Sequence, residues 1–285
     1  MNGQLPEELQ VAVAAVAAEL GLASPEVTVL SGGVANRALR LRDARHDLVL
    51  RVAGPAAAAL GASRSAECAM QALAAGAGLA AAVVLARPEQ GLLVTRFVAG
   101  RTPSQEDMRD PGVITRVGGW MARLHALPPP PGLPAIDFGA RAAAYLETVQ
   151  ARSPSAAAGE LARRLVARRR ALPAAPPAAP CHHDLHHRNF IDDGARLLVV
   201  DWEYAGPGDP AADLAACIGY HELAPPAVEA LLAGYGRDDA ALRARIGMLR
   251  WIFGCLWYGW NAAAALEGVV PEPGLQARLA ARLLD

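Results

Sequence analysis

The 285-residue sequence contains no lysine, and all 27 of its basic residues are arginine. A Walker A phosphate-binding loop requires a lysine, as do a lysine Schiff base and general-base catalysis by a lysine side chain. The sequence therefore excludes these three kinds of site. If a positive side chain binds phosphate in this protein, that side chain is an arginine.

The sequence also has few cysteines, a net charge close to zero and no apolar run long enough to span a membrane. The longest apolar stretch, 72–86, is shorter than the roughly 20 residues of a membrane span and contains glycines. The first ten residues lack the basic and apolar regions of a secretion signal. A net charge of −1, without a basic face rich in aromatics, predicts no nucleic-acid partner. We therefore expect a cytoplasmic protein with reduced cysteines, none of which form a CxxC pair: Cys68, Cys181, Cys217 and Cys255.

The pattern of apolar residues divides the chain into a β-rich first part and a helical remainder. A helix over 6–21 is followed by strand-like runs with turn signals between them. A helix over 63–76, with a serine before it and a glycine at its end, interrupts the strands. The strand-like runs are 26–31, 37–42, 47–52, 81–86 and 91–97. These runs predict an antiparallel sheet with one inserted helix in the first hundred residues.

Strand signals nearly vanish after this point. Helical patterns cover 112–128 and 156–173, proline-rich loops follow each of them, and a short buried strand is predicted at 196–204. The sequence predicts an α+β fold with a small β-sheet lobe over 1–97 and a larger helical lobe over 98–285.

Four histidines surround Asp184 in the segment "CHHDLHHRNF", residues 181–190. Histidines at i, i+3 and i+4 could share one face of a helix, and imidazole is the commonest metal ligand in proteins. A metal-dependent hydrolase that uses His183 and Asp184 is therefore one interpretation. This class needs a further upstream histidine, but His125 is better explained as a packed residue near a helix end.

A second interpretation of the same segment starts from Asp184 and Asn189. Asp201 follows Asn189 after twelve residues and ends the run "LLVV". Phosphoryl transfer uses one carboxylate to accept the proton of the attacking hydroxyl, and an amide oxygen and a further carboxylate to hold Mg²⁺. A loop that carries the first two groups, and a strand that returns the third, would bring them together.

Two long motifs support the second interpretation. "HHDLHHRNFI" resembles the catalytic loop of the choline/ethanolamine kinase and aminoglycoside phosphotransferase superfamily, and "VVDWEYAGPGDPAADLA" (199–215) resembles its second motif. The resemblance implies a bilobal protein-kinase-like fold, with ATP and Mg²⁺ as cofactors. It implies Asp184 as the general base, Asn189 and Asp201 as metal ligands, and His182 as a structural member of the loop. Asp213 would brace that loop.

The resemblance extends to the first hundred residues. "LSGGVANRALRL" (30–41) is similar to the hairpin that covers phosphates in this superfamily, and "LVLRVAG" (48–54) to the strand that carries its basic residue. An arginine there would bind phosphate oxygens as a planar fork. "LLVTRFVAG" (92–100) resembles the adenine hinge, which contacts the base through its main chain. The ATP-binding residues implied are Gly32, Gly33, Asn36, Arg51, Glu67, Thr95 and Phe97.

An aromatic run, "WIFGCLWYGW" (251–260), is the candidate acceptor site. Phe253, Trp257 and Trp260 are spaced to share one helix face, which suits either core packing or a cage for an alkylammonium. Choline kinases are similar here, and Glu203 and Tyr204 would complete the site beside Asp184. Which of Trp251, Trp257 and Trp260 faces the acceptor is open from the sequence.

The resemblance implies an ATP-dependent kinase for a small-molecule alcohol, with choline or a related amino alcohol as the expected acceptor. Thiamine is the first alternative, because "DWEYAGPGD" also suits thiamine kinases and thiazolium is a cation. Aminoglycoside or sugar phosphorylation comes next, although the last hundred residues show no dense acidic run. A pseudokinase is disfavoured by the presence of Asp184, Asn189 and Asp201 together.

Overall fold

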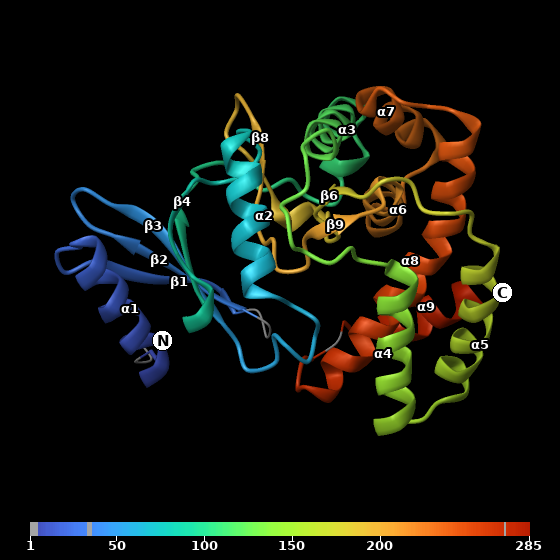
Figure 1. The fold of residues 1–285 in the computed structure, drawn as a ribbon, viewed down its shortest axis with the longest axis horizontal. Helices are drawn as coiled ribbons and strands as arrows, with labels where there is room; N and C mark the ends of the chain where they lie inside the picture. The colour runs from blue at the N-terminus through green and yellow to red at the C-terminus, as the bar shows by residue number, and fades with distance from the viewer. Residues whose placement is uncertain (1–4, 33–35, 271) are drawn as a thin grey trace. The chain divides into compact units, whose positions relative to one another are not determined.

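The computed structural model describes residues 5–32, 36–270 and 272–285. The chain forms two compact units, unit 1 over Met1–Ala99 and unit 2 over Gly100–Asp285 (Figure 1). Within the described ranges, no helix is both long and apolar enough to cross a membrane.

Unit 1 is built on a five-stranded antiparallel sheet with the strand order β1-β2-β3-β5-β4. Helix α2 enters between β3 and β4, so the predicted inserted helix is confirmed. The elements are α1 (Glu7–Leu20), β1 (Glu26–Gly32), β2 (Asn36–Arg42), β3 (Asp47–Ala53), α2 (Arg64–Gly76), β4 (Val83–Arg87), η1 (Pro88–Gln90) and β5 (Leu92–Arg96).

The two faces of strand β3 carry different kinds of side chain, because successive side chains along a strand point to opposite faces. Leu48 and Leu50 are buried in one apolar cluster with residues of α1, such as Leu9 and Val16. Arg51 projects to the opposite face, where its guanidinium meets a side chain of α2. The alternation thus supplies both the core of unit 1 and a positioned arginine.

Unit 2 is mainly helical, and aspartate or serine side chains cap most of its longer helices. Asp110, Asp137, Ser155, Asp209 and Asp239 each accept a hydrogen bond from a main-chain N–H in the first turn of the following helix. The helices are η2 (Asp107–Arg109), α3 (Pro111–His125), α4 (Phe138–Arg152), α5 (Ala156–Ala171), η3 (His187–Asn189), α6 (Pro210–His221), α7 (Pro225–Tyr235), α8 (Ala240–Leu266) and α9 (Leu275–Leu284).

Glycines let α3 and α7 approach closely. A Cβ atom on Gly118 would lie 2.1 Å from the carbonyl oxygen of Leu231, and one on Gly234 would lie 2.0 Å from that of Thr115. Neither position can accept a side chain without moving a backbone. Helix α4 packs on both α5 and α8.

Two short antiparallel pairs of strands lie among these helices. Strand β6 (Ala179–Cys181) pairs with β9 (Gly206–Gly208), and β7 (Phe190–Asp192) pairs with β8 (Leu197–Val199). The strand predicted over 196–204 is therefore too long. It ends at Val199 because the backbone turns at Asp201, where φ is 67°. Strands β6 and β9 were not predicted from the sequence, because each is three residues long and contains proline or glycine.

Candidate active site

Two arginines and one buried glutamate form an ion-pair network in unit 1. The Arg51 Nε donates to Glu67 Oε1 at 2.7 Å, and Glu67 is 1% exposed. Arg64 donates to the other Glu67 oxygen and to the side-chain oxygen of Asn36. The structure thus brings together three residues that the sequence predicted, and Arg64, which it did not. Its signal was the i,i+3 spacing to Glu67 on one helix.

The other residues of unit 1 that were predicted to bind the nucleotide lie at or near the ends of strands β1 and β5. Gly32 ends β1, and Gly33 falls outside the described residues. Thr95 is buried in β5. The Phe97 N–H donates to the carbonyl of Asp47 at 2.9 Å, so this group is already used within unit 1.

In unit 2 the β7–β8 hairpin brings Asn189 and Asp201 to the same end. Phe190 pairs with Val199, and the Val200 N–H donates to the carbonyl of Asn189 at 2.9 Å. This pairing places residue 201 beside the end of the loop that carries Asp184 and Asn189. The backbone at Asp201 therefore lies close to that of Asn189, whose side chain is hydrogen-bonded to Asp184.

Both carboxylate oxygens of Asp184 accept hydrogen bonds. Asn189 Nδ2 donates to Asp184 Oδ2 at 3.1 Å and to the Asp184 carbonyl at 2.8 Å. The Tyr220 hydroxyl donates to Asp184 Oδ1 at 2.7 Å, and His186 Nε2 lies 3.6 Å from Oδ2. Tyr220 was not among the residues predicted from the sequence. Its signal was the seven-residue separation from Asp213, which puts both residues on one face of α6.

The donor set of Asn189 and Asp201 fits Mg²⁺. Because the Asn189 amide nitrogen is committed to Asp184, its oxygen faces the other way, and among the described residues it accepts no hydrogen bond. Amide and carboxylate oxygens are the hard ligands that Mg²⁺ prefers. Asp201 is one of four non-glycine residues with positive φ in the described chain. Such strained backbone is concentrated at functional sites.

A buried carboxylate, Asp213 of α6, holds the start of the loop that carries Asp184. Its oxygens accept the His182 N–H at 2.8 Å and the His183 N–H at 2.7 Å, and His125 Nε2 lies 3.2 Å away. Burial would raise the pKa of Asp213, but the hydrogen bond from His125 and the nearby histidines lower it to about 2. The charged carboxylate therefore fixes the two residues that precede Asp184.

The four histidines of residues 182–187 face different partners. His182 Nε2 lies 3.1 Å from the Val200 carbonyl, and the His183 ring packs on Phe138. His186 contacts the ring of Tyr220, and His187 that of His221. The rings of His186 and His187 meet in a T-shaped contact with their centroids 6.2 Å apart, but those of His182 and His183 pack against other partners. The four side chains therefore do not surround one point, as the ligands of a shared metal ion would.

A second group of side chains that could bind a metal consists of His125, Cys181 and Asp213. Their possible ligand atoms lie within 4.8 Å of one another. His125 and Asp213 already bind each other, and the Asp213 oxygens also serve the loop. Burial raises the pKa of the Cys181 thiol, which opposes a thiolate ligand. The hydrogen bonds within this group and to the loop therefore already use the atoms that a metal ion would need.

The aromatic run on α8 splits into three contact sets. Trp257 stacks on Phe253 at 5.9 Å, and both rings meet the edge of Tyr220. The Trp260 Nε1 donates to the Tyr204 hydroxyl at 2.9 Å. Trp251 instead donates to the Leu283 carbonyl of α9. Trp260 thus contacts the predicted acceptor residue Tyr204, and Trp257 is linked to Asp184 only through Tyr220, whereas Trp251 packs elsewhere.

A guanidinium and two phenols lie beside these rings. The Arg141 guanidinium carbon is 5.8 Å from the Tyr204 ring centroid, and burial lowers the pKa of Arg141. Burial raises the pKa of Tyr145 to about 12, and that of Tyr204 is raised by burial and by the charge of Glu203. Both phenols therefore stay protonated, and the Tyr204 end of the site carries a neighbouring positive charge.

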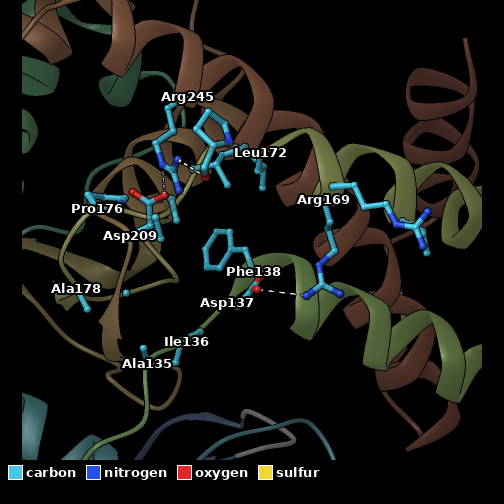
Figure 2. A pocket seen from close by; sticks show the side chains of 17 residues that line it. Ala135, Ile136, Asp137, Phe138, Arg169, Leu172, Pro176, Ala178, Asp209 and Arg245 are labelled. Carbon is cyan, nitrogen blue, oxygen red and sulfur yellow. Dashed lines mark hydrogen bonds and ion pairs between the residues drawn. The ribbon is translucent and has the colours of Figure 1, made fainter.

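A separate cavity of about 600 Å³ opens on unit 2 beside α4 and α5 (Figure 2). Its walls include Phe138, Leu172 and three arginines, of which Arg245 pairs with Asp209 and Arg169 with Asp137. None of the predicted site residues line this cavity. The Phe138 ring, which lines this cavity, also packs against His183, with the two ring centroids 5.0 Å apart.

Comparisons with known proteins cover both units. The sequence pattern of the phosphotransferase enzyme family matches residues 26–245. The choline/ethanolamine kinase family protein from Mesorhizobium loti has a similar structure, with a TM-score of 0.79, 29% identity, and coverage of 97% of this chain and 94% of that one. The predicted superfamily resemblance and the predicted α+β, kinase-like fold class are confirmed.

Similarity to curated sequences is confined to shorter segments. Protein LicA of Haemophilus influenzae is 30% identical over 97 residues, which are 31% of this chain and 36% of that protein. The thiamine kinase of Salmonella paratyphi B is 53% identical over 38 residues, 13% of this chain and 14% of the relative. The chain thus matches about a third or less of the length of these two relatives.

Proposed function

The chain belongs to the phosphotransferase enzyme family, and we propose that it transfers the γ-phosphate of ATP to the hydroxyl of a small alcohol. The prediction of a phosphotransferase is confirmed by this membership. The observation that most strongly supports the proposed reaction is the cluster of Asp184, Asn189 and Asp201 at the end of the β7–β8 hairpin. Three oxygen-bearing groups of these types are what phosphoryl transfer requires.

In this proposal each group of the cluster has one role. Asp184 orients the acceptor hydroxyl and accepts its proton as the bond to phosphorus forms. The Asn189 amide oxygen and the Asp201 carboxylate would hold Mg²⁺, which when bound neutralises charge on the phosphate oxygens. Arg51, oriented by Glu67, would bind phosphate oxygens from unit 1. Unit 1 would thus be the nucleotide-binding lobe and unit 2 the catalytic and acceptor lobe.

We propose choline or a related amino alcohol as the acceptor. A quaternary ammonium cannot donate hydrogen bonds, and aromatic faces bind it instead. Trp257 and Trp260, with Tyr204 and the buried carboxylate of Glu203, would supply such faces and a compensating charge. The similarity to a choline/ethanolamine kinase family protein supports this choice.

Thiamine is the second candidate acceptor, because the chain matches a thiamine kinase at 53% identity over 38 residues. Thiamine is also a cationic alcohol, so the same aromatic rings would suit it. It differs from choline in size and in carrying flat aromatic rings, which stack on tryptophan rather than entering a cage.

An assay of ATP consumption with Mg²⁺ and a panel of alcohols tests the proposal. The panel holds choline, ethanolamine, thiamine, an aminoglycoside and a simple sugar, and product is identified by mass. We expect Mg²⁺-dependent phosphorylation of choline or ethanolamine above the other alcohols. Phosphorylation of thiamine alone would establish the second candidate. ATP binding without turnover of any alcohol would indicate a pseudokinase, and release of phosphate from a phosphate ester without ATP would indicate a hydrolase.

A further inference from the structure

We propose that Tyr220 is a positioning residue that fixes the rotation of the Asp184 carboxylate during phosphoryl transfer. This inference rests on the proposed function, because it assigns a task to Tyr220 only if Asp184 is the base. Tyr220 lies in α6, and its hydroxyl oxygen is 2.7 Å from Asp184 Oδ1.

A carboxylate can rotate about its Cβ–Cγ bond unless both oxygens are held. Asn189 holds Asp184 Oδ2 from the loop itself, and Tyr220 holds Oδ1 from a different element. The distance of 2.7 Å is typical of a strong hydrogen bond from a hydroxyl to an ionised oxygen. Each carboxylate oxygen has about two acceptor positions, so Oδ1 can accept the substrate hydroxyl as well.

Aromatic neighbours determine where the Tyr220 hydroxyl points. The edges of three rings meet Tyr220 at centroid distances of 4.7 Å for Phe253, 5.2 Å for Trp257 and 5.6 Å for His186. All three contacts are T-shaped, an arrangement that aromatic pairs prefer. The half-buried phenol is therefore held on several sides and does not depend on Asp184 for its orientation.

Tyr220 is also suited to remain a donor. Desolvation and the negative charge of Asp184 raise the pKa of Tyr220 well above its ordinary value. The phenol therefore keeps its proton and cannot replace Asp184 as the base at neutral pH. The role left to it is geometric, since a fixed carboxylate aligns the acceptor hydroxyl with the phosphorus atom.

The test is Tyr220→Phe, which keeps the ring and removes only the hydroxyl. We expect kcat to fall about 10- to 100-fold while the KM for ATP changes little, and the melting temperature should fall only by the loss of one hydrogen bond. Tyr258→Phe is the matched control, because this buried tyrosine of α8 makes no hydrogen bond through its hydroxyl among the described residues. The control should leave kcat unchanged.

A double-variant cycle with Asp184→Ala separates positioning from general support of the fold. If Tyr220 acts through Asp184, Tyr220→Phe should have no further effect on the residual turnover of Asp184→Ala. Melting temperatures of the same four proteins should also be non-additive, a readout that does not need activity. Equal losses of kcat in both backgrounds, or an unchanged kcat in Tyr220→Phe, would overturn the inference.

The same proteins distinguish failure of the inference from failure of the proposed function. Turnover by the wild type, with full turnover by Tyr220→Phe, removes the positioning role and leaves the kinase. No turnover of any alcohol by the wild type removes the kinase and the positioning role together, even where non-additive melting temperatures identify the contact between Tyr220 and Asp184.

Discussion

Units 1 and 2 hold their central charged groups by different means. In unit 1 Glu67 is buried between the guanidinium groups of Arg51 and Arg64, so opposite charges compensate each other. In unit 2 Asp184 is held by a phenol hydroxyl and an amide, which are neutral donors. Ion pairing suits a carboxylate such as Glu67, which orients its partner and takes up no proton in the proposed reaction. Neutral donors orient a carboxylate and leave it a full negative charge with which to accept a proton.

The two networks also differ in how far along the chain their members lie. Glu67 is 16 residues from Arg51 and three from Arg64. Asp184 is 36 residues from Tyr220, and His182 is 31 residues from the Asp213 carboxylate that holds it. If the proposed roles hold, substitutions near Glu67 should weaken nucleotide binding through neighbouring residues. Substitutions in elements far from Asp184 in the sequence should still lower the rate of phosphoryl transfer.

The largest effect is expected at Asp184. Asp184→Asn keeps the size of the side chain and removes the proton acceptor, so kcat should fall about 10²- to 10⁴-fold with the KM for ATP nearly unchanged. Steady-state kinetics with varied ATP and acceptor measure both. Asp238→Asn, which changes only an exposed ion pair with Arg243, is the control. Near-full turnover by Asp184→Asn would contradict the assignment.

The next effect is expected at Arg51, where unit 1 would bind phosphate. Arg51→Ala should raise the KM for ATP about 10- to 100-fold, as the loss of about 1.5–3 kcal/mol of charged hydrogen bonds implies. Arg64 still pairs with Glu67, so the variant should fold. Arg51→Lys should recover part of the loss, because it restores the charge without the planar fork.

The exposed Arg42 of strand β2 supplies a control for this prediction. Arg42→Ala removes a positive charge from the same sheet and should leave the KM for ATP unchanged. If Arg42→Ala and Arg51→Ala raise that KM equally, the effect is one of net charge and the contrast between the two units is lost.

The loop in unit 2 should also make stability depend on pH. Burial lowers the pKa of His183 from 6.5 to about 3. As pH falls below 6.5, the unfolded chain takes up a proton at this residue that the folded chain does not, and the free energy of unfolding falls until about pH 3. We expect a loss of about 2 kcal/mol between pH 7 and pH 4.5 from His183, measured by urea unfolding.

His183→Asn isolates this contribution, because asparagine tolerates the positive φ of 65° at this position. The variant should lose less stability between pH 7 and pH 4.5 than the wild type. Burial also lowers the pKa of His182 and of His221, so part of the acid sensitivity remains. An identical pH slope in both proteins would show that His183 is not the group that titrates.

The sequence predicted those parts of the fold and of the site that depend on short-range patterns. Alternating leucines and turn residues predict the sheet of unit 1, because both signals are contained in each hairpin. The spacing of Asp184, Asn189 and Asp201 predicts their cluster, because one hairpin is enough to close it. Charge spacing along α2 would also have predicted Arg64.

The parts that escaped prediction depend on packing between distant elements. Tyr220 meets Asp184 because α6 is held against the loop through Asp213. The spacing of Asp213 and Tyr220 places both on one face of α6, but it does not encode how that face packs on the loop. The aromatic spacing on α8 could not separate Trp251 from Trp257 either, since both suit a buried helix. The contacts of Trp251 with α9, and of Trp257 with Tyr220, decide between them.

The smallest effects are expected at the two tryptophans beside the acceptor residues. Trp257→Leu and Trp260→Leu keep apolar volume and remove the aromatic face. If these faces bind a quaternary ammonium alcohol, the KM for that acceptor should rise about three- to 30-fold, as 0.5–2 kcal/mol per contact implies. The KM for ATP should not change.

The two variants should not be equal, because the charge around them differs. Trp260 binds Tyr204, whose ring lies 5.8 Å from the Arg141 guanidinium carbon. That positive charge offsets part of the negative charge of Glu203 at this end and weakens its attraction for a cation, so we expect the larger rise in acceptor KM for Trp257→Leu. Trp251→Leu, at a residue that contacts Leu283, is the control and should lower only the melting temperature. If all three variants lower the melting temperature and leave the acceptor KM unchanged, these rings are core. The reason for preferring a cationic alcohol over a sugar is then removed, and the difference between units 1 and 2 is confined to their charged groups.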